Sequence, residues 1–392
     1  MLYFAEGLPF GLVLDNLPVY FRMHGVSLTA IGLMSLLRSP WWAKVFWSPA
    51  VDQIGERRLW IATCLTVMAA ALAVLPHLPP APVGVSLIVL LLIFTTAAAT
   101  QDVAIDAYTI ELIEPGEEGI ANGVRVSAYR VALIVAGGAL LAIVTWTTWA
   151  VAFTAAAVML LALACVVLLL PRVERRAQTP REWAHTFRAW LQRPGVVGVF
   201  VFVFLYKLGD TTMGPMVKPF WVDRGLRPEE IALISTTLGV AMSIAGALAG
   251  GALTSRWGIF TALWTLGLVQ ATSNLGYAAA AWMDAGRPAI YAASIVESFG
   301  AGLGTAAFLS FLMNICDKEQ AATQFALLSA LFNLSGSLGG SLSGRGVELL
   351  GYSRYFFVTF LLALPAFGLL PWVRPWIRER PPDGAAATRT EP

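Results

Sequence analysis

Six acidic and six basic side chains lie inside long apolar stretches of this sequence, where charge is energetically expensive. An unpaired ionisable group near the middle of a hydrocarbon layer costs from about 2.5 to more than 10 kcal/mol. Each group is therefore expected to pair with an opposite charge, to contact water or to bind a solute. They are Glu6, Asp15, Asp102, Asp106, Asp210 and Glu297, with Arg38, Lys44, Arg125, Arg130, Lys207 and Lys218.

The composition indicates that lipid surrounds most of the chain. Of its 392 residues, 57% are hydrophobic and 13% are charged, whereas soluble domains carry about 25% charged residues. A helix needs roughly 20 apolar residues to cross a bilayer, so the length admits about twelve spans. We predict an all-α membrane protein with twelve transmembrane helices near residues 2–22, 28–48, 59–76, 84–112, 119–143, 149–170, 196–221, 229–253, 258–280, 288–315, 320–343 and 354–373.

Basic residues are distributed unevenly among the predicted connections. The longest connection carries six arginines between Arg172 and Arg193, and the even-numbered connections hold most of the others. Because cytoplasmic loops are enriched in Lys and Arg, both termini are predicted to be cytoplasmic. The predicted organisation is an N-terminal six-helix bundle, a cytoplasmic central loop, a C-terminal six-helix bundle and a cytoplasmic tail, over residues 1–171, 172–194, 195–373 and 374–392.

The two predicted bundles repeat one another at an offset near 200 residues. At the turn between the first and second spans of each half, four residues correspond to four others: Phe21, Gly25, Ile31 and Leu33 to Trp221, Gly225, Ile231 and Leu233. An offset of 203 relates Gly55 to Gly258 in a later loop. Duplicated halves are typical of secondary transporters, in which solutes bind between the repeats.

Some of the intramembrane charges are predicted to neutralise each other. Asp102 and Asp106 lie four residues apart on one helix face, at depths similar to those of Arg125 and Arg130 on the next span. A structural pairing and a functional role are both open for the two aspartates. Residues five apart point about 140° away from each other, so one arginine is predicted to face a central cavity, and the deeper Arg130 is favoured.

The seventh predicted span is interrupted at its centre, where Lys207 and Asp210 lie three residues apart next to Gly209. Interrupted membrane helices line cavities or pack on protein, so this pair either binds solute or satisfies itself. Asp15, beside Asn16 and Pro18, is in a similar position on the first span. Glu297 has no basic neighbour on its own span, which makes it the strongest candidate for a carboxyl group that binds and releases a proton.

Other features are interpreted as structural. Glu6 and Lys44 match in depth and are predicted to form a pair. Four glycines on the eleventh span are predicted to allow close helix packing: Gly336, Gly339, Gly340 and Gly344.

The segment from Pro49 to Arg58 resembles the signature between the second and third helices of major facilitator superfamily transporters, a G-x-x-x-D-R-x-G-R-R pattern. Asp52, Gly55, Arg57 and Arg58 match it, and Pro49 and Gln53 depart from it. The resemblance implies that the matching residues form a conformational gate that holds the two halves closed on the cytoplasmic side. Charges at helix ends favour such an arrangement.

Further segments resemble one branch of that superfamily. They are Tyr3 to Gly11, Gly25 to Gly32, Gln101 to Tyr108, Asn122-Gly123 and Ala128 to Arg130. They are similar to the AmpG-type muropeptide permeases, the acetyl-coenzyme A transporters and a group of bacterial siderophore importers. This resemblance implies a multi-pass transporter in a bacterial cytoplasmic (inner) membrane, with a muropeptide-like solute first and a siderophore second.

The combined expectation is a proton-coupled symporter of an anionic amphipathic solute that works by alternating access. The predicted substrate-binding residues are Arg38, Arg130, Lys207, Lys218, Tyr108 and Tyr129. The predicted proton-coupling residues are Glu297, Asp210, Asp15, Asp102 and Asp106. The expected partners are a small-molecule substrate, protons and the lipid bilayer.

The sequence also predicts several absences. We expect no nucleic-acid partner, because the net charge is only +2, and no cofactor or metal site, because no ligand cluster is visible. We also expect a monomer. A membrane-embedded enzyme that modifies lipids or sugars and a sensor that binds without transport are the alternatives. His24, His77 and His185 all fall in connections, which argues against an enzyme.

Overall fold

The computed structural model describes residues 1–53, 55–112, 127–172, 188, 192–283, 286–316 and 321–377, and every regular element that it describes is a helix. The elements of the N-terminal half are α1 (Leu2–Gly11), η1 (Leu12–Asn16), α2 (Leu17–Met23), α3 (Leu28–Leu33), η2 (Met34–Arg38), α4 (Ser39–Ala43), η3 (Lys44–Phe46), α5 (Ser48–Gln53), α6 (Arg57–Val74), η4 (Leu75–His77), α7 (Val85–Leu112), η5 (Ile134–Ala139), α9 (Leu140–Trp146) and α10 (Trp149–Leu168).

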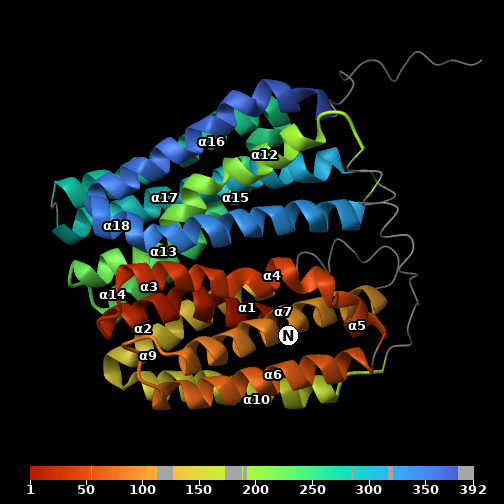
Figure 1. Ribbon diagram of the computed structural model, residues 1–392, viewed down its shortest axis with the longest axis vertical. Coiled ribbons are helices and arrows are strands. Elements are labelled where there is room, and N and C mark those ends of the chain that lie inside the picture. The colour runs from red at the N-terminus through yellow and green to blue at the C-terminus, as the bar shows by residue number, and fades with distance from the viewer. Residues whose placement is uncertain are drawn as a thin grey trace, which may run out of the picture.

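The elements of the C-terminal half are α12 (Val196–Tyr206), α13 (Leu208–Asp223), α14 (Pro228–Glu230), η6 (Ile231–Leu238), α15 (Gly239–Trp257), α16 (Ile259–Trp282), α17 (Gly286–Ile315), α18 (Ala321–Val373) and η8 (Arg374–Trp376). Figure 1 shows these helices in one layer and those of the N-terminal half in a second layer beneath it. The predicted central loop lies mostly outside the described residues, so its limits stay a prediction.

Eight helical stretches in the described part of the chain are long and apolar enough to cross a membrane. The last of them, Leu327–Trp376, is too long for one crossing at about 1.5 Å per residue. Gly351 has a positive φ of 74° within it and divides it into two helices. The chain is also helical over the predicted first, second and ninth spans. The membrane class is therefore confirmed, while the number twelve stays a prediction.

The internal repeat has a precise structural counterpart at the turns that follow α2 and α13. Gly25 and Gly225 have φ values of 76° and 71°, a conformation that favours glycine because it lacks a Cβ atom. In each turn the amide after the glycine donates to a carbonyl five residues earlier: Val26 N to Phe21 O at 3.0 Å, and Leu226 N to Trp221 O at 3.1 Å. The two halves thus end their first helices in the same way.

The two layers contact each other closely at the end that contains these two turns, which we name the closed end (Figure 1, left side). Arg22 Nη2 donates to Asp223 Oδ2 at 2.7 Å, and Arg22 Nε donates to the second carboxylate oxygen. Glu348 of α18 accepts hydrogen bonds from the Thr29 amide at 2.9 Å and from its hydroxyl at 2.6 Å. Charged groups from both layers therefore join the layers at this end.

Glycines let the backbones approach each other at the closed end. A Cβ atom on Gly344 would lie 1.7 Å from the Leu28 carbonyl oxygen, and one on Gly32 would lie 2.6 Å from the Gly344 nitrogen. A Cβ atom on Gly340 would lie 2.5 Å from Ser35 Oγ. The prediction that the glycines of this span serve close helix packing is confirmed.

Candidate functional site

A cavity of about 390 Å³ lies between the two layers and is lined by residues of both. Its volume falls within the range of small-molecule sites, about 300–1,000 Å³. Among the described residues, three basic and three acidic side chains line it: Arg38, Lys207, Lys218, Asp15, Asp210 and Glu297. All six are among the residues predicted to bind substrate or protons, and the structure brings them to one cavity. Their roles stay predictions.

Lys207 stands at a break in the seventh predicted span. Helix α12 ends at Tyr206 and α13 begins at Leu208, while Lys207 itself has φ −103° and ψ 2°. Its ammonium group lies 3.2 Å from Asp210 Oδ2 and donates to Thr305 Oγ1 at 2.8 Å. The predicted interruption is confirmed, and it places a buried ion pair on the cavity wall.

A second ion pair joins the two layers across the cavity. Lys218 Nζ of α13 lies 3.3 Å from Asp15 Oδ1 of η1, and it donates to the Ser235 and Thr236 hydroxyls at 2.8 Å each. Asp15 belongs to a π-helical turn, an irregular form that is frequent at functional sites. A Cβ atom on Gly137 would lie 2.2 Å from Asp15 Oδ2, so a glycine in η5 makes room for this carboxylate.

Arg38 and Glu297 line the cavity from opposite layers, on η2 and α17. The Arg38 guanidinium lies over the Phe10 ring at 5.8 Å, a cation–π contact. Glu297 accepts a long hydrogen bond of 3.4 Å from Ser298 Oγ. Among the described residues, neither side chain forms an ion pair, which leaves both available to a solute or a proton.

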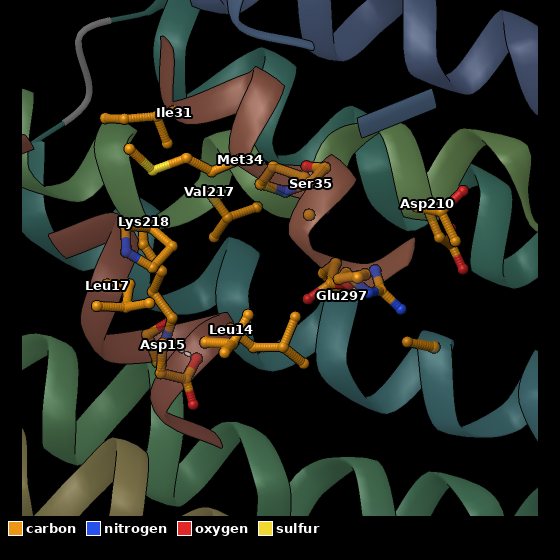
Figure 2. Close-up of a pocket in the computed structure, with 18 of the residues that line it drawn as sticks. Leu14, Asp15, Leu17, Ile31, Met34, Ser35, Asp210, Val217, Lys218 and Glu297 are labelled. Carbon is orange, nitrogen blue, oxygen red and sulfur yellow. Dashed lines mark hydrogen bonds and ion pairs between the residues drawn. The ribbon is translucent and has the colours of Figure 1, made fainter. Parts of the chain in front are cut away.

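Apolar side chains separate the charged parts of the cavity. Figure 2 shows Asp15 and Lys218 on one side, Asp210 on the other, and Leu14 and Val217 between them. The wall also includes Leu17, Ile31, Met34, Leu37 and Phe332. The site therefore suits a solute that carries both charge and apolar surface.

The structure places the two aspartates of the fourth predicted span away from the cavity lining. Lys44 Nζ forms an ion pair with Asp102 Oδ2, and Tyr3 donates to Asp106 Oδ1 at 3.5 Å. Asp102 is thus paired with a residue of the second predicted span, whereas the sequence had suggested Arg125 or Arg130 of the fifth. Lys44 was predicted to pair with Glu6. Arg125 lies outside the described residues.

Three predicted substrate-binding residues also lie outside the cavity lining. Tyr108 is 1% exposed and donates to the Pro171 carbonyl oxygen at 2.9 Å. Tyr129 packs against Phe10, with ring centroids 6.2 Å apart. Arg130 is not among the residues that line this cavity, so its role in binding stays a prediction. Residue depth along a helix does not fix the direction in which the helix turns a side chain.

The residues that match the superfamily signature lie at the opposite end of the molecule from the closed end. Arg57 Nη1 donates to the Val51 carbonyl oxygen at 2.5 Å. Arg58 donates to the Leu168 and Leu170 carbonyl oxygens at 3.1 and 3.2 Å, at the C-terminal end of α10, where a cation is favoured.

Arg58 also donates to Glu56 Oε2 at 2.7 Å. This hydrogen bond lowers the pKa of Glu56 below its usual value. Gly55 has a φ of 65°, and the Asp52 side chain lies outside the described residues. The role of this segment as a gate stays a prediction.

Sequence reasoning missed the residues that join the layers at the closed end. Asp223 accepts hydrogen bonds from Arg22 and from the Tyr352 hydroxyl, the latter at 2.7 Å. Glu348 holds the start of α3. One signal was visible: Arg22 and Asp223 have opposite charges, and they lie at or just after the ends of equivalent spans of the repeat.

A membrane-spanning helical protein with two related layers and a charged cavity between them belongs to the class of secondary transporters. The model of the Major Facilitator Superfamily matches residues 1–340 and 199–392. The chain belongs to this superfamily.

The chain is 30% identical over 381 residues to the Anhydromuropeptide permease of Escherichia coli K12, with 94% of this chain and 78% of that protein covered. Two solved structures share its fold. A bacterial homologue of the lysosomal transporter Spinster, in an inward-facing and unoccupied conformation, has a TM-score of 0.78 at 15% identity and covers 97% of both chains. A D-xylose-proton symporter has a TM-score of 0.72 at 14% identity, over 94% of this chain and 95% of that one.

Proposed function

We propose that this protein is a proton-coupled symporter that carries an anionic amphipathic solute, most similar to an anhydromuropeptide, across a bacterial inner membrane. Two six-helix units, residues 1–171 and 195–373, rock against each other around the cavity. Arg38, Lys207 and Lys218 attract the anionic groups of the solute, and Glu297 carries the proton. The twelve-span count and the cytoplasmic termini belong to the same proposal.

One observation carries this proposal: three cations and three carboxylates from both layers line a single cavity that also has an apolar wall. Ionisable groups persist within membranes where they serve a hydrated pathway or a binding site. The cation of Arg38 has no carboxylate partner among the described residues, which suits a negatively charged solute. A guanidinium group binds carboxylates in two-point contacts.

The contacts of the closed end support an inward-facing state. Arg22 and Asp223 join the layers there, next to turns that the distribution of basic residues assigns to the outer side of the membrane. The cavity would then open toward the cytoplasm, as in the unoccupied conformation of the Spinster homologue.

A siderophore or another metabolite is the second candidate solute within the same superfamily. A membrane-embedded enzyme for lipids or sugars is the alternative of another class. Two features of the cavity favour transport over catalysis: it lies between two repeated layers, and four of its six charged groups are paired with each other.

Uptake by the reconstituted protein tests the proposal. Radiolabelled anhydromuropeptide and a ferric siderophore would be offered to proteoliposomes with and without an inward pH gradient. We expect the gradient to drive accumulation of the muropeptide but not of the siderophore. Binding without exchange across the bilayer would exclude transport, and a covalently altered solute would indicate an enzyme.

The coupling role of Glu297 has its own test. Glu297→Gln is expected to abolish gradient-driven accumulation while counterflow exchange of the solute continues, because the amide fills the same space without binding a proton. Accumulation equal to that of the unaltered protein would remove Glu297 from the coupling role. Glu229→Gln, which changes a carboxyl group outside the cavity lining, is the matched control.

A further inference from the structure

The ion pairs of the cavity leave one group of each sign without a charged partner. Lys207 pairs with Asp210, and Lys218 pairs with Asp15. Arg38 and Glu297 form no ion pair with each other or with any other described residue. The two remaining charges come from opposite layers and face the same cavity.

Arg38 already lies against the opposite layer. A Cβ atom on Gly336 of α18 would lie 3.3 Å from Arg38 Nη1, so this glycine gives the guanidinium group room at the boundary between the layers. Glu297 lies on α17, another helix of the C-terminal layer, and accepts a long hydrogen bond of 3.4 Å from Ser298 Oγ. A movement of one layer against the other changes the separation of these two groups.

We propose that Arg38 and Glu297 exchange partners during the transport cycle, which rests on the symport function proposed above. In the empty protein the two side chains bind each other when the cavity closes at the end opposite the closed end. In the loaded protein Arg38 binds the anionic group of the solute, and Glu297 holds a proton taken from one side and released to the other.

This exchange makes coupling obligatory for a simple electrostatic reason. Closing the cavity removes water, and a buried ion without a partner is strongly disfavoured. A proton on Glu297 without a solute leaves Arg38 unpaired, and a solute on Arg38 without a proton leaves the Glu297 carboxylate unpaired. Only the empty and the doubly loaded proteins have balanced charge, so only these two forms close readily.

The other groups around Glu297 do not upset this balance. The ionisable side chains that line the same cavity are Lys207, Asp210 and Lys218 on α13, Asp15 on η1, Arg38 on η2 and Tyr277 on α16. From η6 and α18, the described lining residues are Ser235 and Phe332, which carry no charge. The two lysines and two aspartates neutralise each other in pairs, so Arg38 is the cation left for Glu297.

A distance measurement on the empty protein tests the exchange without any solute. Spin labels would be placed by Leu59→Cys in α6 and Val197→Cys in α12, near the starts of these helices at the end opposite the closed end. These side chains are 46% and 70% exposed. Cys64, Cys165 and Cys316 would be replaced by Ser. Double electron–electron resonance in nanodiscs then reports the separation of the layers in acidic and alkaline buffer.

We expect a short distance to become more populated in alkaline buffer, where Glu297 is charged and can bind Arg38. The ratio of short to long distances should rise about tenfold, which equals about 1.4 kcal/mol. Glu297→Gln should abolish this pH dependence. Arg38→Gln should reverse it, because the charged Glu297 carboxylate then has no partner in alkaline buffer and disfavours closing. Glu229→Gln should retain it, because this carboxyl group lies outside the cavity lining.

Two double variants keep the test decisive. Arg38→Glu combined with Glu297→Arg exchanges the charges and should restore the short distance. If that variant does not fold, Arg38→Gln combined with Glu297→Gln removes both charges and should close to the same extent at every pH. Identical pH dependence in the unaltered protein and in Glu297→Gln would overturn the proposal. Because no solute is used, this outcome is independent of whether a muropeptide is transported.

Discussion

The contact between α3 and α18 at the closed end can be tested by adding a single methyl group, because Gly344 allows the two helix backbones to touch there. Gly344→Ala would place a Cβ atom 1.7 Å from the Leu28 carbonyl oxygen, whereas real Cβ contacts are not shorter than 3.0 Å. The helices must therefore separate by at least about 1.3 Å. Overpacking of this kind costs about 1–3 kcal/mol.

Opening of the closed end relieves this strain. If the whole strain acts on the conformational equilibrium, Gly344→Ala shifts it about 5- to 150-fold away from the closed end. Spin labels introduced by Met23→Cys and Leu349→Cys, at side chains that are 46% and 73% exposed, would report this as a longer distance between the layers.

Gly368→Ala is the matched control, because a Cβ atom there meets nothing within 4 Å in the same helical stretch. Gly32→Ala tests the contact from the other layer and should act like Gly344→Ala. If Gly344→Ala remains folded and has the same closed-end distance as Gly368→Ala, the reasoning from backbone contact is wrong.

Two further ion pairs have measurable roles. Lys44→Ala should lower the free energy of unfolding by about 3 kcal/mol, because it leaves the Asp102 carboxylate without this partner. This value is the lower end of the range for breaking a buried ion pair, since the Lys44 side chain is 27% exposed. An unchanged thermal midpoint in detergent would contradict this. Arg22→Asp should weaken the closed end by about 1 kcal/mol, since both side chains of that pair are 24% exposed. Adding Asp223→Arg should reverse the change in closed-end distance, and no reversal would show that the pair is not the cause.

The sequence alone indicated that lipid surrounds the protein, and it identified the charged residues that line the central cavity. Apolar length and scarce charge require a membrane, and the repeated glycines at positions 25 and 225 identified two equivalent turns, which have matching backbone hydrogen bonds. The break at Lys207 was also visible, because glycine and proline next to a charge are poorly compatible with a continuous membrane helix.

Only the tertiary structure decided which charges meet. Depth along a span follows from counting residues, but the direction of a side chain depends on how each helix is rotated and packed against its neighbours. This is why Lys44 pairs with Asp102 and Arg130 does not line the cavity, although both have the depth expected of other roles. The structure also decided that Arg38 and Glu297 stay outside the two ion pairs of the cavity. An ion pair requires its atoms to lie within a few ångströms, and the packing of the two layers sets these distances.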